Sequence, residues 1–155
     1  MTAIYRDDIQ FEKPVTFTAA TGQRMGKFLE IPFTAAVVAT YGLGDALTSD
    51  LLPANAIVTG QHIVITTAFT YSSGNTTGVS LKVGTASDDD AFITNTALGG
   101  TAGYRRSVAG ASVNGSVVAG GAEAVVGVFT ATGGTPSLAH LSAGAGKIVI
   151  DYIEV

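Results

Sequence analysis

The sequence contains no cysteine and no tryptophan, and it is poor in charge. Without cysteine there is no disulfide framework and no thiolate site. Only 13% of residues are Asp, Glu, Lys or Arg, whereas about 25% is usual in soluble domains. A lone monomer normally covers its surface with more charge than this. The composition therefore favours a protein that buries part of its surface against other protein, rather than a free one whose surface is made polar by Ser and Thr.

Long apolar runs and basic stretches are also missing. No apolar run approaches the roughly 18 residues that a membrane-spanning helix needs, and the start, MTAIYRDDIQFEKP, is charged where a secretory signal would be apolar. The net charge of −4 does not suit binding to a phosphate backbone, which favours a basic stripe. We therefore expect no membrane span, no secretory signal and no nucleic-acid partner.

Helical periodicity never extends beyond a turn or two, and short strand patterns take its place. Residues 57–69, IVTGQHIVITTAF, are rich in Ile, Val and Thr on both faces, which is typical of a strand inside a sandwich or an interface. Residues 79–83 alternate apolar and polar positions more cleanly. Because the turn formers YSSGNTTG at residues 71–78 join the two runs, we predict that they form a hairpin.

Further strands are expected on both sides of this pair. Residues 25–33 place Met25, Leu29, Ile31 and Phe33 on one face. Residues 122–132 and 146–155 each read as a good strand, and the second runs to the last residue. The glycine-rich residues 95–121 have little periodicity and suggest a long excursion around one or two weak strands.

The number of strands predicts the fold class. Seven to nine short strands in 155 residues indicate an all-β protein with a single β-sandwich, jelly-roll-like, at residues 14–155. Residues 1–13 predict an extended N-terminal arm with four apolar side chains that could dock on another surface. Only single helical turns are expected, around Leu138 and Leu141 and within residues 45–52.

The only acidic cluster is formed by Asp88, Asp89 and Asp90. Three carboxylates could bind Ca²⁺, but their spacing lacks the alternating ligands and the glycine of an EF-hand loop. Asp side chains are also common as caps of the following turn. We favour the turn interpretation over a cation site.

The chain has two histidines, His62 and His140. A metal site without cysteine would need both together with carboxylates, and no G-x-S-x-G nucleophile elbow is present. Isolated histidines are more often packing or surface residues. We therefore expect no catalytic residues, no metal and no cofactor, and a protein that is not an enzyme.

Several motifs resemble those of tailed-bacteriophage structural proteins. They are LPANA at residues 52–56, the strand end ITTAF at 65–69, VGTASDDDA at 83–91, TATGG at 130–134 and SAG at 142–144. In such proteins an L-P-A-N-A-type turn leads into a strand ending V-T-T-A-F, and a later strand ends V-G-T-A-x-D-x-D-A. The resemblance covers about half of the chain and carries no catalytic residues.

This resemblance implies a head decoration, or cement, protein. Such a protein would be made in the bacterial host cytoplasm and would lie on the outer capsid surface of the virion as a homotrimer, with the major capsid protein as its partner. Candidate capsid contacts lie in the arm, and candidate subunit-interface residues lie in the glycine-rich stretch. The capsid-contact residues are Tyr5, Arg6, Asp7, Asp8 and Phe11, and the subunit-interface residues are Tyr104, Arg105 and Arg106.

Three alternatives remain open on the sequence. The first is a tail-fibre or receptor-binding jelly-roll module that recognises host glycan, although the absence of tryptophan removes a common platform for sugar rings. The second is a jelly-roll enzyme, in which His62 and His140 would have to meet carboxylates. The third is another virion component, such as a tail or neck protein.

Overall fold

The computed structural model of the chain describes residues 26–72, 74–105 and 121–154. The predicted arm at residues 1–13 lies outside this range. The described part contains eight strands, one short α-helix and one 3₁₀ turn. In chain order these are β1 (Lys27–Thr34), α1 (Ala35–Val38), β2 (Ala46–Leu52), β3 (Ile57–Tyr71), β4 (Gly78–Thr85), β5 (Ile93–Ala97), β6 (Gly103–Arg105), β7 (Glu123–Thr132), η1 (Leu138–His140) and β8 (Leu141–Ile153).

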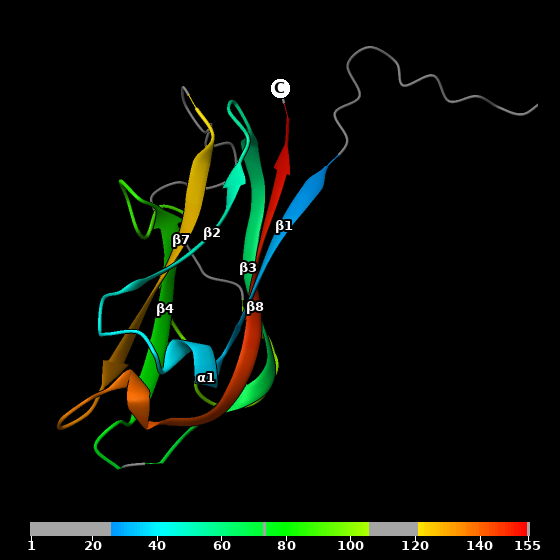
Figure 1. Cartoon of the computed structure of the whole chain (residues 1–155). Coiled ribbons are helices and arrows are strands. Elements are labelled where there is room, and N and C mark those ends of the chain that lie inside the picture. Colours follow the sequence, from blue (N-terminus) through cyan, green and yellow to red (C-terminus); the bar gives the residue numbers. More distant parts are fainter. Residues whose placement is uncertain (1–25, 73, 106–120, 155) are drawn as a thin grey trace, which may run out of the picture.

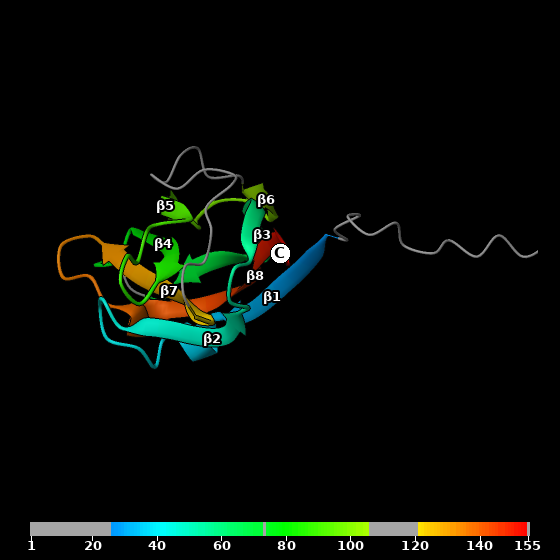
Figure 2. The same cartoon turned by 90° about the horizontal axis from the view of Figure 1, so that it is seen from above.

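The strands form two four-stranded antiparallel sheets packed face to face (Figures 1 and 2). Sheet A has the order β1-β8-β3-β6, and sheet B has the order β2-β7-β4-β5. The pairing is nested, because the first strand pairs with the eighth, the second with the seventh, the third with the sixth and the fourth with the fifth. The predicted all-β sandwich is therefore confirmed.

The predicted hairpin of β3 and β4 is wrong, although both strands exist. β3 pairs with β8 and β6 in sheet A, whereas β4 pairs with β7 and β5 in sheet B. The polar connection between them crosses from one sheet to the other. Turn-forming residues fix where a chain reverses, but the choice of sheet depends on partners far away in the sequence, which local composition cannot reveal.

The connection from β3 to β4 contacts the connection from β7 to β8, which lies at the same end of the sandwich. Thr76 is 2% exposed, and its hydroxyl oxygen lies 2.7 Å from Nδ1 of His140 and accepts a hydrogen bond from the Ser137 N–H at 3.1 Å. Gly133 has a φ of +144°, and a Cβ there would lie 1.9 Å from the carbonyl oxygen of Asn75. The two connections therefore fix each other, and with them the placement of β3 and β4 in different sheets.

Three phenylalanine rings mark the centre of the core. The ring centroid of Phe33 lies 6.0 Å from that of Phe69 and 5.4 Å from that of Phe129. Two glycines of β8 leave space for these rings. A Cβ at Gly144, where φ is +146°, would lie 2.4 Å from the Phe69 ring, and one at Gly146 would lie 2.8 Å from the Phe33 ring. The SAG motif thus lies in a strand, where its small residues admit aromatic packing.

The remaining sequence expectations have mixed outcomes. β1 buries Ile31 and Phe33 as predicted, and η1 confirms the helical turn around Leu138. The helical turn expected within residues 45–52 is wrong, because these residues form β2. A register shift between Thr48 and Leu51 breaks the alternation that would have revealed the strand.

Two further differences concern the ends of elements. The chain turns into α1 directly after β1, where the side chain of Thr34 accepts a hydrogen bond from the Val37 N–H. A single helical turn in an apolar run leaves too short a pattern to be recognised. β8 begins at Leu141, five residues before the predicted strand, so residues 142–144 are part of the strand.

The aromatic cluster gives a first testable prediction. Phe33→Ala removes a ring that is 2% exposed and leaves a cavity between the sheets, so we expect a loss of about 3–5 kcal/mol in the free energy of unfolding. The measurement is urea denaturation followed by circular dichroism. Phe28→Ala on the same strand is the control, because Phe28 is exposed and its loss is expected to change stability by less than about 0.5 kcal/mol.

The contact between the two connections gives a second prediction. Thr76→Val keeps the shape of the side chain but removes the acceptor for the Ser137 N–H, so stability is expected to fall by about 1–3 kcal/mol. Thr77→Val is the matched control, since the Thr77 side chain is exposed and its replacement is expected to be nearly neutral. Equal stability of the two variants in urea denaturation would contradict the proposed role of Thr76.

Candidate interaction surfaces

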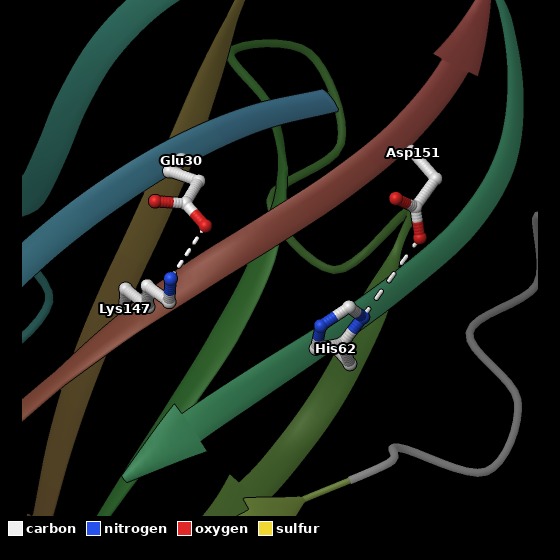
Figure 3. Close-up of polar contacts among 4 residues, drawn as sticks. All are labelled: Glu30, His62, Lys147 and Asp151. Atoms are coloured by element: carbon white, nitrogen blue, oxygen red, sulfur yellow. Dashed lines mark hydrogen bonds and ion pairs between the residues drawn. The ribbon is translucent and has the colours of Figure 1, made fainter. Parts of the chain in front are cut away.

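The outer face of sheet A carries ion pairs between neighbouring strands. Glu30 on β1 pairs with Lys147 on β8, and Asp151 on β8 faces His62 on β3 with 3.9 Å between Oδ2 and Nδ1 (Figure 3). Gly60 makes room for this carboxylate, because a Cβ there would lie 2.8 Å from Asp151 Oδ2. Exposed pairs of this kind contribute little to stability. They do give this face a charged, water-compatible surface.

A further ion pair lies where β1 begins and β8 ends. Lys27 Nζ is 2.7 Å from Glu154 Oε2, and this hydrogen bond raises the pKa of Lys27 above its usual value. Both side chains are about half exposed. The charged character of sheet A therefore extends to its β1 edge.

The outer face of sheet B combines small uncharged side chains with one ion pair. Lys82 on β4 lies opposite Val128 in register and pairs with Asp89. Val126 and Val128 on β7 are 6% and 5% exposed, although they alternate with the core residues of that strand. Next to them, the hydroxyl groups of Ser80 and Thr130 lie 2.9 Å apart.

Four large apolar side chains are exposed in the segment from β1 to β2. These residues, which we call the apolar flank, are Phe28, Val37, Leu43 and Leu51, and they are 66%, 42%, 51% and 60% exposed. All four lie between the start of β1 and the end of β2, the strands at the same side of the two sheets (Figure 2). They are the exposed large hydrophobic residues of the described chain.

The apolar flank was not predicted, although one signal pointed to it. Phe28 shares its parity with Glu30, whereas the core-facing Ile31 and Phe33 lie on the other parity of β1. A large aromatic on the polar face of a strand is a sign of an interface. Val37, Leu43 and Leu51 follow no alternation, so their exposure becomes visible only in the fold.

The predicted interface residues are only partly covered by the structure. Tyr104 and Arg105 lie on β6, the outer strand of sheet A on the side opposite to β1, where they pair in register with Val64 and Ile63 of β3. The remaining candidates lie outside the described residues. These are Tyr5, Arg6, Asp7, Asp8, Phe11 and Arg106.

Backbone hydrogen bonds close the acidic loop that follows β4. The carbonyl oxygen of Asp88 accepts hydrogen bonds from the N–H groups of Thr85 and Ala91, at 2.7 and 3.3 Å. The loop folds directly over Gly84, where a Cβ would lie 1.9 Å from that same carbonyl oxygen. The glycine of the VGTASDDDA motif is therefore required by the close approach of the loop.

The three carboxylates of this loop lie close together. One oxygen from each of Asp88, Asp89 and Asp90 falls within 4.8 Å of the others, and Lys82 pairs with Asp89. A hydrogen bond with Asp88, burial and the neighbouring negative charges raise the pKa of Asp90, while Lys82 opposes the shift. Exposed acidic groups at this spacing are common without an ion, so the cluster by itself does not define a cation site.

The two histidines lie in different parts of the fold. His62 is in the middle of β3 on the outer face of sheet A, beside Asp151. His140 is the last residue of η1, and its Nδ1 forms a hydrogen bond with the hydroxyl group of Thr76. Within the described ranges, one group of His, Cys, Asp or Glu side chains is close enough to share a metal ion, and it consists of the aspartates of the acidic loop. No helix in those ranges has the length and hydropathy to cross a membrane.

Comparison with known proteins gives one structural likeness. No protein-family model matches the chain, and no curated protein matches it. Among solved structures, it is similar to a chain of the cyanophage Pam1 capsid asymmetric unit, with a TM-score of 0.56 and 18% sequence identity. The similarity covers 86% of this chain and 86% of that chain. At this identity the likeness establishes a shared fold.

The acidic loop gives a third prediction, which concerns pH. Because the pKa of Asp90 is raised in the folded state, its contribution to stability is full below the unfolded pKa and is lost as pH rises through the folded value. Asp90→Asn should therefore raise the melting temperature at neutral pH and leave it nearly unchanged in strong acid. Lys82→Met should lower it at neutral pH, because Lys82 offsets the negative charges.

The measurement is thermal unfolding of the three proteins by circular dichroism between pH 3 and pH 7. A difference between Asp90→Asn and the wild type that is independent of pH would show that the carboxylates of the loop do not repel one another in the folded state.

Proposed function

We propose that the protein is a bacteriophage capsid decoration, or cement, protein, which binds the outer surface of the head and stabilises the shell. The observation that carries the proposal is the fold shared with a chain of a cyanophage capsid, over 86% of each chain. The motifs that resemble phage structural proteins support it independently, since they were recognised in the sequence alone. In this function the protein works through interface area and is not an enzyme.

The strand topology supports the same proposal. Two four-stranded sheets with nested pairing, first with eighth through fourth with fifth, support the assignment of the sandwich as a jelly roll, an architecture that is common in viral capsid domains and also in lectins. The motifs behind the resemblance have structural roles in this fold. LPANA forms the turn from β2 to β3, with Asn55 at a φ of +60° and the Ala56 N–H donating to the Pro53 carbonyl.

The surface is suited to contacts with other protein. The apolar flank offers exposed apolar area for packing, whereas ion pairs lie on sheet A and between Lys82 of sheet B and Asp89. A cement protein needs no strong single contact, because many modest contacts repeated by capsid symmetry resist expansion together through avidity. The low charge of the chain is consistent with this mode of action.

The proposal includes specific partners. The major capsid protein is the principal partner, and the protein itself forms a homotrimer at the virion surface. The arm, residues 1–13, is proposed to contact the capsid. The side chains that we assign to this contact are Tyr5, Arg6, Asp7, Asp8 and Phe11.

The main alternative is a receptor-binding or tail-fibre module that recognises glycan, because lectins also use jelly rolls. The two functions are separated by co-sedimentation of the purified protein with expanded, undecorated heads of its own phage and, in parallel, with host cells. A decoration protein is expected to saturate the heads at a fixed ratio per capsid and to leave the cells unbound. Binding to cells and not to heads would replace the proposal with the glycan function.

The arm gives a fourth prediction. Replacing Tyr5 and Phe11 together by Ser removes two apolar anchors, so binding to expanded heads is expected to weaken by about tenfold or more. The melting temperature of the sandwich should not change. Thr66→Asp on the outer face of sheet A is the control for an unrelated surface change and should bind heads as the wild type does. Undiminished binding by the arm variant would place the contact elsewhere.

A further inference from the structure

We infer that one end of the sandwich, which we call the acidic end, docks on a basic protein surface that presents several lysine or arginine side chains. On a virion this surface belongs to the shell, so the identity of the partner rests on the proposed function. The fold indicates, in addition, the sign of the charge at the contact and the end of the molecule that meets it. The acidic end is defined by the carboxylates of Asp88, Asp89, Asp90, Glu123, Asp151 and Glu154.

The strand register places these carboxylates at the same end of both sheets. In sheet B, β7 begins with Glu123 opposite the last residue of β2, and β4 ends beside β7, directly before the acidic loop. In sheet A, Asp151 lies near the end of β8, beside the starts of β1 and β3, and Glu154 directly follows β8. The turn from β2 to β3 connects the two sheets at this end (Figure 1). The acidic end therefore spans both layers of the sandwich.

The lysines of the acidic end do not cancel its charge. Lys27 and Lys82 lie there, and they pair with Glu154 and Asp89. With six carboxylates and two ammonium groups, the described side chains of this end have a formal net charge of −4. Both lysines are thus already engaged, and the remaining negative charge is available to a partner.

The opposite end of the sandwich carries two connections without charge. Residues 72–77 and 133–140 contain no Asp, Glu, Lys or Arg. They are bonded to each other, because the N–H and the hydroxyl group of Ser72 both donate to the carbonyl oxygen of His140, at 2.8 and 3.0 Å. An uneven distribution of charge orients a protein as it approaches a charged partner. A basic surface therefore attracts this protein with the acidic end first.

The spread of the carboxylates favours a protein surface over a single metal ion as the partner. Only the three aspartates of the acidic loop are close enough to share an ion within the described chain. Such an ion would leave Glu123 on β7 and Asp151 on β8 outside its reach. A hydrogen bond with Asp88, burial and the neighbouring negative charges raise the pKa of Asp90. Cationic side chains spread over a partner surface would reach both sheets and would relieve this repulsion.

The direction of the chain supports the same orientation. β1 begins at the acidic end, so the chain that precedes Lys27 joins the sandwich there. In the proposed function the arm contacts the shell, and the end to which the arm is joined then faces the shell. Complementary charge at a contact speeds association and selects the orientation of the partners. In this arrangement the arm anchors the protein and the acidic end orients the sandwich.

The test is co-sedimentation of the full chain with expanded, undecorated heads at two salt concentrations, in the presence of EDTA. Raising the salt from about 0.1 M to about 1 M shortens the screening length from about 10 Å to about 3 Å. Binding of the wild type is therefore expected to weaken by about tenfold or more. Asp88→Asn together with Asp151→Asn removes one carboxylate from each layer and keeps the shape of both side chains. At about 0.1 M salt this variant is expected to bind about fivefold more weakly than the wild type.

The matched control is Thr135→Lys together with Ala139→Lys. This double variant changes the net charge by the same amount, but at exposed positions of the uncharged connections. It is expected to bind heads as the wild type does and to keep the same dependence on salt. Melting temperatures of all three proteins are measured by circular dichroism, and unchanged or higher values exclude unfolding as the cause of weaker binding.

Several results would overturn the inference and leave the decoration function intact. They are binding that does not depend on salt, undiminished binding of the Asp88→Asn, Asp151→Asn variant, and equal weakening of the two double variants. Binding that is lost in EDTA would do the same, because a bridging divalent ion implies an acidic partner surface. Failure of the wild type to bind heads at either salt concentration, with or without EDTA, would instead refute the proposed function and the partner named here.

Discussion

The pairing of β3 with β8 is the constraint on which the rest of the structure depends. These are the two longest strands, and β8 lies between β1 and β3. The pairing aligns Ile65 with Gly146 and brings Phe69 over Gly144, so the aromatic core forms where the two strands meet. Because β1 pairs with the other edge of β8, the positions of Phe28 and of the ion pairs on sheet A also depend on the placement of β8.

The small residues of the sequence acquire a common explanation from this arrangement. Gly84, Gly133, Gly144 and Gly146 each lie against backbone or an aromatic ring at a distance that leaves no space for a Cβ. Three of these glycines, Gly84, Gly133 and Gly144, lie in the motifs that resemble those of phage structural proteins, so these motifs contain close approaches in the sandwich. Such positions resist substitution for reasons of packing.

Strand content could be predicted from the sequence because alternation and residue type are local properties. Residues 57–69 and 79–83 were identified as strands for this reason, but their assignment to one hairpin failed, since the contact of Thr76 with Ser137 and His140 joins segments far apart in the chain. The register shift in β2 hid a strand in the same way. Of the candidate surfaces, Tyr104 and Arg105 were proposed from residue type and stay a prediction, whereas the exposure of the apolar flank depends on how α1 and β2 fold back against β1.

The nested order of the strands has a consequence for synthesis. β1 is the first described strand to leave the ribosome, and its partner β8 is the last, with Lys27 opposite Tyr152 in the completed sheet. Sheet A therefore cannot close before β8 has been synthesised, and pairing between such distant segments is slow because a long loop must first be ordered. Until then Ile31 and Phe33 have no strand beside them, so β1 is exposed to misassociation until β8 pairs with it.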